Sequence, residues 1–264
     1  MSHVLVTGAA SGMGAATARL LAAGGHRVVG IDVDADGLGR LAADGSLVEA
    51  LVVDLADPAA ITAAVGGREV DALVNVAGLG PDAQNARLIW SVNLLAPLRV
   101  AAAVSVRAGG SIVNVASITG ELAVARHADL LEDPLREGFL DEVVAVAGEP
   151  AEAYTHSKWG LLCETERMAV RLAPQVRVNA VSPGVVETPM GERSMQFDWT
   201  RKAADRIPAG RLGRADEVAR AVRFLISPDA SYVVGSRLVV DGGYVARQRT
   251  RTPSAPISGA VEVG

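Results

Sequence analysis

The sequence predicts a single α/β domain built on a doubly wound, seven-stranded parallel sheet. Three observations support this fold class. A chain of 264 residues is long enough to bury most of its apolar surface in one core. Half of the residues are hydrophobic but only 3% are aromatic, which is typical of aliphatic strands buried on both faces. Short β-branched runs also alternate with longer alanine-rich stretches, the pattern of repeated βαβ units.

Seven such runs are expected to be the strands. In chain order they are residues 3–8 (HVLVTG), 26–32 (HRVVGID), 50–55 (ALVVDL), 71–78 (DALVNVAG), 111–117 (SIVNVAS), 176–184 (VRVNAVSPG) and 237–243 (RLVVDGG). Parallel order would make this a Rossmann-type sheet, whose ligand lies at the carboxyl ends of the strands. Functional residues are therefore expected at the ends of these runs.

One interval departs from this alternation of expected strands and helices. Residues from about 119 to 151 contain two helical patterns, which we interpret as a small helical insert. In the second pattern Asp133 is expected to cap a helix, with Pro134 at its first position and Gly148 as its stop. Its apolar residues recur every four positions, at Leu131, Leu135, Phe139 and Val143.

The domain is expected to span residues 1–246. The tail at 247–264 is polar and rich in Pro, Ser and Gly, so we expect it to be flexible and poorly packed, or to dock on a neighbouring subunit. The insert is acidic, which predicts a solvated face. Because its carboxylates lack the spacing of cation ligands, no metal is expected.

Charge and composition exclude several classes of partner. The net charge is −5 and no basic cluster falls in the body of the chain, so we expect no nucleic acid. No apolar run is long enough to cross a bilayer, and MSHVLVTGAA lacks the pattern of a signal peptide. We therefore expect a cytoplasmic protein with no membrane partner. The single cysteine, Cys163, is interpreted as a small buried hydrophobe, consistent with a reducing compartment.

A glycine-rich turn follows the first expected strand, in TGAASGMG at residues 7–14. Gly8, Gly12 and Gly14 let the backbone approach a pyrophosphate, while free N–H groups and the positive end of the next helix stabilise its charge. The spacing G-x-x-x-G-x-G differs from the more familiar G-x-G-x-x-G. The turn alone leaves open both a nucleotide site and an ordinary strand-to-helix connection.

The second expected strand favours the nucleotide. It ends in Asp32, eighteen residues after Gly14, where a carboxylate can accept hydrogen bonds from the adenosine ribose. The same charge repels a 2′-phosphate, and the glycine-rich turn contains no Lys or Arg to offset it. We therefore expect NAD rather than NADP. Later strand ends add Asp54 and the segment 75–78 to the rim of the same crevice.

Tyr154 and Lys158 are four residues apart in AYTHSKWG, so on a helix they share one face. An ammonium about 4 Å from a phenol is worth up to roughly 4 kcal/mol at an effective dielectric of about 20, enough to lower the tyrosine pKa by about three. Such a tyrosine exchanges a proton with an alcohol or carbonyl, typically worth about 10²–10⁴ in rate. A packed ring beside a solvated amine is the structural alternative.

Two further polar residues lie where a reaction centre would need them. Ser117 follows the fifth expected strand, where its hydroxyl could hold a carbonyl oxygen, and Asn93 lies in an expected helix within WSVNLLAP. Taken singly, Ser117 is equally consistent with a helix cap and Asn93 with a satisfied polar core residue.

In combination these segments resemble the short-chain dehydrogenase/reductase family. The ordered signature TGAASGMG, NVAG, the Asn93 helix, Ser117, YTHSK and SPGVVETPM spans nearly the whole chain. The resemblance implies that Tyr154 is the acid–base group and that Ser117 orients the carbonyl. It also implies that Lys158 binds the nicotinamide ribose and lowers the tyrosine pKa, and that Asn93 supports a proton-relay water.

The resemblance further implies a set of cofactor-binding residues. The segment at Pro183, Gly184 and Thr188 matches the part that holds the nicotinamide carboxamide, with a backbone contact from Val186. The full expected set comprises Gly8, Ser11, Gly12, Met13, Gly14, Asp32, Asp54, Leu55, Asn75, Ala77, Gly78, Tyr154, Lys158, Pro183, Gly184, Val186 and Thr188.

Within the family, the sequence is most similar to bacterial 3α-hydroxysteroid dehydrogenase/carbonyl reductases and their coniferyl-alcohol dehydrogenase relatives. It shares NVAGLGP, the short link to SVNLLAP, and a separation of 37 residues (154 − 117) between the serine and the tyrosine. We therefore expect an NAD-dependent oxidoreductase that interconverts a bulky, steroid-like secondary alcohol and its ketone. A coniferyl-type alcohol dehydrogenase is the enzymatic alternative, and a non-catalytic NAD-binding sensor is the alternative of another class.

The same resemblance bears on oligomeric state. Family members usually associate through the helices that flank the active site, and the insert enters just before one of them. We expect the insert to block or reshape that surface and to leave a homodimer.

Overall fold

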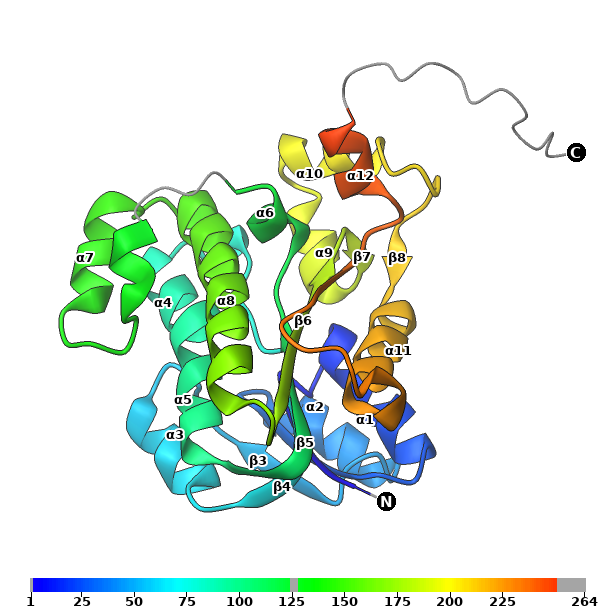
Figure 1. Ribbon diagram of the computed structural model, residues 1–264. Coiled ribbons are helices and arrows are strands. Elements are labelled where there is room, and N and C mark those ends of the chain that lie inside the picture. Colours follow the sequence, from blue (N-terminus) through cyan, green and yellow to red (C-terminus); the bar gives the residue numbers. More distant parts are fainter. Residues whose placement is uncertain (1, 124–127, 251–264) are drawn as a thin grey trace, which may run out of the picture.

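The computed structural model describes residues 2–123 and 128–250. Seven strands form one sheet in the order β3-β2-β1-β4-β5-β6-β9, and every neighbouring pair is parallel (Figure 1). This order confirms the doubly wound, Rossmann-type fold that the sequence predicts. The strands of this sheet are β1 (His3–Thr7), β2 (Arg27–Asp32), β3 (Glu49–Val52), β4 (Glu69–Asn75), β5 (Ser105–Val115), β6 (Arg177–Pro183) and β9 (Arg237–Val240).

The chain winds outward from the centre of the sheet in two directions. From β1 it continues to β2 and β3 on one side, and from β4 it continues to β5, β6 and β9 on the other. The loops after β1 and β4 therefore diverge, and a crevice forms between them at the carboxyl ends of the strands. Thr7 and Asn75, the last residues of these two strands, are paired in the sheet, so the segments that follow them begin side by side.

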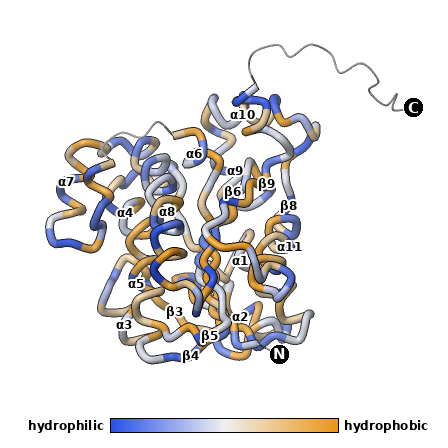
Figure 2. The backbone as a smooth tube through the Cα atoms, viewed as in Figure 1, coloured by the Kyte–Doolittle hydropathy of each residue, from blue (hydrophilic) through white to orange (hydrophobic). Residues whose placement is uncertain are grey.

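Two hydrophobic cores lie on opposite faces of the sheet. Leu21 and Val222 are buried in the first, and Ile61 and Leu161 in the second. In Figure 2, hydrophobic stretches follow the helices α4 and α5 and the adjoining part of the sheet. The helices on the first face are α1 (Gly12–Ala23), α2 (Ala35–Ala43) and α11 (Ala215–Ile226). Those on the second face are α3 (Pro58–Val65), α4 (Ala86–Trp90), α5 (Ala96–Ala103) and α8 (Pro150–Leu172).

Shorter elements surround the carboxyl ends of the strands and the insert. A π-helical turn, η2 (Ser91–Leu95), joins α4 to α5. Two short strands, β7 (Val186–Glu187) and β8 (Gly213–Arg214), form a separate parallel pair. The remaining helices are η1 (Pro81–Ala83), α6 (Ile118–Glu121), η3 (Ala128–Glu132), α7 (Phe139–Val146), α9 (Pro189–Ser194), α10 (Asp198–Ala204), η4 (Pro228–Ala230) and α12 (Tyr244–Arg249).

The second helix of the insert begins later than the sequence predicts. Residues 133–138 form turns, and α7 starts at Phe139 instead of Pro134. Leu135, which the four-residue apolar pattern placed in the core, is 47% exposed. The helix ends at Val146, two residues before the expected stop. Residues 124–127, also part of the expected insert, lie outside the described residues.

Long-range packing sets the start of α7. The Phe139 ring meets Trp90 edge-on, with ring centroids 6.0 Å apart, and Arg136 lies over the same ring at 5.4 Å. Gly138 precedes the helix with a φ of 79°, a conformation that glycine adopts without strain. The aromatic contact and the left-handed glycine together outweigh the local capping signal of the Asp-Pro pair.

The boundary expected at residue 246 falls inside α12, which continues to Arg249. This helix is attached to the domain by Arg249, whose guanidinium lies 3.7 Å from the buried carboxylate of Glu121. The remainder of the expected tail, residues 251–264, lies outside the described residues.

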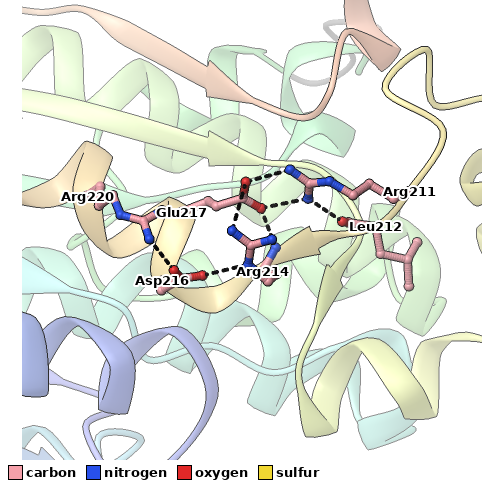
Figure 3. A network of polar contacts seen from close by, with 6 residues as sticks. All are labelled: Arg211, Leu212, Arg214, Asp216, Glu217 and Arg220. Atoms are coloured by element: carbon pink, nitrogen blue, oxygen red, sulfur yellow. Dashed lines mark hydrogen bonds and ion pairs between the residues drawn. The ribbon is translucent and has the colours of Figure 1, made fainter.

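A network of charged side chains connects the start of α11 to the segment around Arg211 and Arg214 (Figure 3). Glu217 accepts hydrogen bonds of 2.7 and 2.9 Å from Arg211 and one of 2.8 Å from the backbone N–H of Arg214. The Arg211 guanidinium is the main cause that lowers the pKa of Glu217 to about 2, so the pair stays charged at neutral pH. Because Arg214 belongs to β8, the network steadies the β7–β8 pair.

Candidate active site

A groove of about 410 Å³ lies at the carboxyl ends of β1, β2 and β4, where the direction of winding changes. Its walls come from the glycine-rich turn, the end of β2 and the segment after β4. The expected cofactor residues that line it are Gly8, Ser11, Gly12, Met13, Gly14, Asp32, Asp54, Leu55, Ala77, Gly78 and Thr188. The structure therefore brings together most of the nucleotide site that the sequence predicts.

Close backbone contacts explain two glycines of the turn. Gly8 has a φ of 66°, and a Cβ added there would lie 2.7 Å from the Cα of Ala77. A Cβ on Gly14 would lie 1.9 Å from the carbonyl oxygen of Gly8. A side chain at either position would push the turn away from its neighbours. The glycines thus keep the turn close to the crevice, as a pyrophosphate site requires.

The N-terminus of α1 lies at this groove. Its N-cap residue, Ser11, makes no side-chain capping hydrogen bond, and its first turn contains no acidic residue. Because the residues of this turn line the groove, free backbone N–H groups and the positive end of the helix dipole are presented to it. This arrangement fits the diphosphate of a dinucleotide.

Asp32 connects the end of β2 to the glycine-rich turn. Its Oδ2 accepts a 2.9 Å hydrogen bond from the Ala10 N–H, and its Oδ1 accepts one of 3.1 Å from the Asp34 N–H. Each carboxylate oxygen retains a second lone pair, and the residue remains on the wall of the groove. The side chain can therefore accept further hydrogen bonds from ribose hydroxyls.

A second cavity, of about 350 Å³, adjoins the groove and shares Met13, Thr188 and Met190 with it. One wall comes from α6 and α8 and carries Ser117 and Tyr154. The rest of the lining comes mainly from the segment after β6 and from α9, α10 and α12, which lie to the right of α8 in Figure 1. Most of the lining is apolar and includes Pro81, Ile118, Leu122, Val185, Val186, Met190, Trp199 and Ala203.

Ser117 and Tyr154 line this cavity from two closely packed elements. Ser117 is the N-cap of α6, and its Oγ accepts hydrogen bonds from Thr119 N at 3.2 Å and Thr119 Oγ1 at 3.1 Å. Tyr154 lies in the second turn of α8. The two helices approach closely at Gly120, where an added Cβ would lie 2.9 Å from the backbone of Lys158. Capping and cavity lining are thus both roles of Ser117.

Lys158 and Asn93 lie behind this pair, 4% and 0% exposed. Lys158 Nζ donates a 2.9 Å hydrogen bond to the carbonyl oxygen of Val115. Asn93 Oδ1 accepts from the Leu79 N–H at 2.7 Å, and its Nδ2 donates to the Leu79 carbonyl at 2.9 Å. Both side chains border Gly78, because a Cβ there would approach Lys158 Nζ to 3.2 Å and Asn93 Oδ1 to 3.3 Å. Ser117 and Tyr154 thus line the cavity, while Lys158 and Asn93 lie beside Gly78, a residue of the groove, and line neither space themselves.

The π-helical turn η2 places Asn93 for this contact. Such turns recur at functional sites, where the widened helix displaces residues from the regular α-helical positions. Here the Asn93 amide is fully engaged with the backbone of Leu79, and its Nδ2 also lies 3.4 Å from Ser157 Oγ. In this structure the side chain braces the loop after β4.

Burial shapes the two titrating groups of the site. It raises the pKa of Tyr154, the neighbouring Ser117 hydroxyl lowers that pKa, and the negative charge of Asp82 raises it. Burial also lowers the pKa of Lys158 to about 8. The lowering of the tyrosine pKa that we expected from Lys158 does not appear. The ammonium is directed at the Val115 carbonyl oxygen, and desolvation dominates both groups.

Some expected cofactor residues lie elsewhere. Gly184 and Val186 line the second cavity. Asn75, Lys158 and Pro183 line neither the groove nor the cavity. Asn75 is buried, and its Nδ2 donates a 2.9 Å hydrogen bond to Oδ1 of Asn114, its partner on β5. Its side chain therefore belongs to a polar contact in the core of the sheet.

Several lining residues were not identified from the sequence. The groove also contains Val33, Val53, Leu79, Leu88, Val92, Pro189, Met190 and Arg193. The second cavity also contains Thr155, Gly191, Ser194, Thr200 and Tyr244 beside its apolar lining. The Thr-Pro pair at residues 188–189 is a helix-start signal that could have located α9. No local pattern marks α10 as a wall of the cavity.

Three further observations concern the described residues. A larger hollow of about 720 Å³ lies at the amino ends of the strands, beside Gly109 and Gln175, and contains no expected site residue. Within 2–123 and 128–250, no group of three or more His, Cys, Asp or Glu residues is placed to hold a metal ion. In that same part of the chain, no helix combines the length and hydropathy needed to cross a membrane.

Comparison with known proteins decides the family. The profile described as short chain dehydrogenase matches residues 2–128, and that described as enoyl-(acyl carrier protein) reductase matches residues 140–245. The chain is 32% identical to the 3-alpha-hydroxysteroid dehydrogenase/carbonyl reductase of Comamonas testosteroni, over 94% of this chain and 98% of that protein. The chain belongs to the short-chain dehydrogenase/reductase family. It is also 36% identical, over 98% of its length, to the uncharacterized short-chain type dehydrogenase/reductase y4vI of Sinorhizobium fredii, and spans about half (48%) of that protein.

Solved structures agree with this assignment. The 3-alpha-hydroxysteroid dehydrogenase from Pseudomonas sp. B-0831, complexed with NADH, matches with a TM-score of 0.79 and 32% identity, over 95% of this chain and 100% of that one. A putative 2-deoxy-d-gluconate 3-dehydrogenase from Agrobacterium tumefaciens, with bound NADP, matches with a TM-score of 0.72 and 32% identity, over 93% and 96%. This short-chain dehydrogenase/reductase is therefore an oxidoreductase that acts on an alcohol or ketone with a nicotinamide cofactor.

Proposed function

We propose that the protein is an NAD-dependent oxidoreductase that interconverts a bulky secondary alcohol and its ketone. The observation that carries this proposal is the junction of a glycine-lined nucleotide groove with an apolar cavity that has Ser117 and Tyr154 on its wall. A bound nicotinamide cofactor supplies or accepts the hydride. The protein's own residues bind and orient the substrate and exchange the proton with it.

The preference for NAD is supported by the charges on the groove. Asp32 presents a carboxylate where a 2′-phosphate would otherwise be accommodated. Among the residues that the structure describes, Arg193 is the only cation lining the groove, and its Nε lies 2.6 Å from the Asp82 carboxylate. No groove-lining cation is therefore left to compensate a 2′-phosphate beside Asp32.

Each catalytic residue has a role that its position supports. Tyr154 would exchange the proton with the substrate oxygen from the cavity wall, while the Ser117 hydroxyl would donate a hydrogen bond to the same oxygen. Lys158 lies between Gly78 and the end of β5, where it would bind the nicotinamide ribose. Asn93 holds the loop after β4 and would support a proton-relay water beside Lys158.

The shape and lining of the second cavity favour a bulky, largely apolar substrate such as a hydroxysteroid. A volume of about 350 Å³ with mostly aliphatic and aromatic walls suits a fused-ring skeleton. The names of the Comamonas and Pseudomonas relatives point to the same substrate class. Coniferyl-type aromatic alcohols are the alternative that the same cavity would admit.

The test is NAD reduction by purified protein with androsterone and with coniferyl alcohol, each measured in parallel with NADP. We expect turnover with androsterone and NAD. Tyr154→Phe should lose at least about 10²-fold in turnover, whereas Tyr232→Phe, a change at a fully exposed side chain, should be unaffected. Full turnover by Tyr154→Phe would contradict the mechanism. Tight NAD binding without turnover on a broad alcohol panel would favour a non-catalytic sensor.

We also propose that the protein is a homodimer whose helices α5 and α8 are covered by the insert. The turn after η3 forms a shallow hollow with these helices, lined by Leu98, Pro134, Leu135 and Met168. Arg167 on α8 donates a hydrogen bond to the Leu131 carbonyl of η3. Light scattering should give the mass of two chains, and a compact tetramer would contradict the proposal.

A further inference from the structure

Five buried side-chain atoms in the described residues have no hydrogen-bond partner. They are His26 Nδ1, Asn75 Oδ1, Asp82 Oδ1, Thr200 Oγ1 and Arg237 Nε, of which the last still forms an ion pair with Glu166 at 2.7 Å. Of these residues, Thr200 alone lines either the nucleotide groove or the substrate cavity. A buried polar group left unpaired costs about 1–3 kcal/mol, and nearly all such groups in folded proteins are paired. Because Thr200 lines the cavity, its buried hydroxyl lies close to a space where a ligand can supply the missing partner.

The usual local partners of this hydroxyl already accept other hydrogen bonds, although the Gln196 carbonyl oxygen keeps a second lone pair. A threonine in a helix commonly donates to the carbonyl oxygen three or four residues before it. For Thr200 these are the carbonyls of Phe197 and Gln196. The Phe197 oxygen accepts from the N–H groups of Thr200 and Arg201, at 3.1 and 3.2 Å. The Gln196 oxygen accepts from the Arg201 guanidinium at 3.0 Å.

Two other helical threonines, Thr17 and Thr165, follow the usual pattern. Thr17 donates to Met13 at 2.7 Å, and Thr165 donates to Leu161 at 2.7 Å. Polar side chains near Thr200 on the same wall are also paired. Ser194 Oγ donates to the Met190 carbonyl at 2.8 Å, and Thr188 Oγ1 accepts from the Gly191 N–H at 3.0 Å. The unpaired hydroxyl of Thr200 thus differs from the hydroxyls of Thr17, Thr165, Ser194 and Thr188.

Thr200 lines the cavity from another element than the reacting groups. It is 2% exposed and lies on α10, whereas Ser117 and Tyr154 belong to the wall formed by α6 and α8. In Figure 1, α10 lies beyond the end of β6, above and to the right of α8. A substrate whose carbinol carbon sits at Tyr154 would direct its far end toward α10.

We propose that the Thr200 hydroxyl binds a second polar group of the substrate, at the end remote from the reacting carbon. This inference rests on the proposed function and narrows its substrate class. The substrate is a bulky, largely apolar alcohol or ketone that carries a distal oxygen, such as a keto or hydroxyl group. Because the surrounding wall is apolar, an analogue without that oxygen leaves the hydroxyl unpaired and is selected against.

The test compares alcohols that differ only in the distal oxygen. One pair is androsterone and 5α-androstan-3α-ol; the shorter pair is decahydronaphthalene-2,6-diol and decahydronaphthalen-2-ol. We expect wild-type kcat/KM with NAD to favour the oxygenated member of at least one pair by about tenfold. Thr200→Val, which is nearly isosteric, should abolish that preference and change the rate on the other member by less than about twofold. Thr200→Ser should retain the preference.

Thr62→Val serves as the matched control, because it removes an exposed threonine hydroxyl from α3. Thermal unfolding should show that all three variants fold. Equal rates on both members of each pair in the wild type would overturn the role of Thr200 while leaving the proposed function intact. A preference that persists in Thr200→Val, or a loss of rate in that variant that is equal on both members, would have the same consequence. Failure of the wild type to oxidise any of the four alcohols would overturn the proposed function and this inference with it.

Discussion

The ammonium group of Lys158 donates a 2.9 Å hydrogen bond to the carbonyl oxygen of Val115, two residues before Ser117. The bond connects α8 to the end of β5, so the expected catalytic lysine and serine are positioned relative to each other through the backbone. The lysine is 4% exposed, and burial lowers its pKa to about 8. A cation is therefore held in the protein interior at a cost in stability.

Replacing this cation should stabilise the fold while abolishing activity. Near pH 7, Lys158→Met should raise the free energy of unfolding by about 2–3 kcal/mol, allowing for the Val115 carbonyl left without its donor. Between pH 8 and 10.5 the Lys158 side chain is more protonated in the unfolded chain than in the folded one. The free energy of unfolding of the wild type therefore rises with pH across that window, as the buried ammonium loses its proton. The advantage of the variant should therefore shrink from pH 8 toward pH 10.5.

Denaturant unfolding at several pH values measures this difference. Lys202→Met, at an exposed position of α10, is the control and should change stability little at any pH. A Lys158→Met protein that is less stable than the wild type near pH 7 would show that the buried ammonium is a net stabilising group.

The ion pair between Asp82 and Arg193 should tune the pH dependence of the reaction. The Asp82 charge raises the pKa of Tyr154, while the Arg193 guanidinium, 2.6 Å from the carboxylate, partly neutralises that charge. Asp82→Asn should therefore shift the rising limb of the pH profile for alcohol oxidation to lower pH. Arg193→Met should shift it to higher pH, because it leaves the carboxylate unopposed.

The two shifts should have opposite signs at saturating NAD and substrate. Saturation matters because Arg193 lines the nucleotide groove, and its loss is also expected to raise the KM for NAD. Shifts of the same sign in both variants would indicate that the loss of the ion pair acts through the position of α9 instead of through charge.

The close contact between Gly14 and Gly8 predicts a large effect of one methyl group. Gly14→Ala places a Cβ 1.9 Å from the Gly8 carbonyl oxygen, so the turn must move away and the anion site is lost. We expect a loss of about 1–3 kcal/mol in stability and of detectable NADH binding by fluorescence. Gly39→Ala is the matched control, since a Cβ there meets nothing within 4 Å and should stabilise α2 by about 0.5–1 kcal/mol.

Asp32 should set the choice between NAD and NADP. Asp32→Asn removes the charge but keeps a side-chain oxygen that can accept the Ala10 N–H hydrogen bond. The ratio of kcat/KM for NAD to that for NADP should fall at least about tenfold, through a loss on NAD and a gain on NADP. Steady-state kinetics with both cofactors measures the ratio, and an unchanged ratio would assign the preference to another part of the groove.

The sheet and the nucleotide turn were predictable from the sequence because local patterns dictate them. Buried parallel strands need aliphatic, β-branched runs, and each expected run became one strand of the central sheet. The glycines of the turn respond to backbone contacts that only a hydrogen side chain permits, as the 1.9 Å approach at Gly14 shows. The Tyr154 and Lys158 pair follows from helical periodicity, which places residues four apart on one face.

Tertiary contacts decided what local patterns could not. Asp133 and Pro134 carry a sound capping signal, yet α7 starts five residues after Pro134, because Phe139 packs against Trp90. Asn75 sits at a strand end as expected, but its partner on the neighbouring strand draws its side chain into the core.

The cavity wall also depends on tertiary contacts that local sequence patterns do not predict. Thr200 has no distinguishing motif, and its hydroxyl is buried without a partner because of where α10 packs in the folded protein. Sequence by itself determined the sheet and the cofactor groove and indicated the candidate reacting groups, since these depend on periodicity and backbone geometry. Only the tertiary structure decided how burial tunes those groups and what faces them, because both depend on segments distant in the chain.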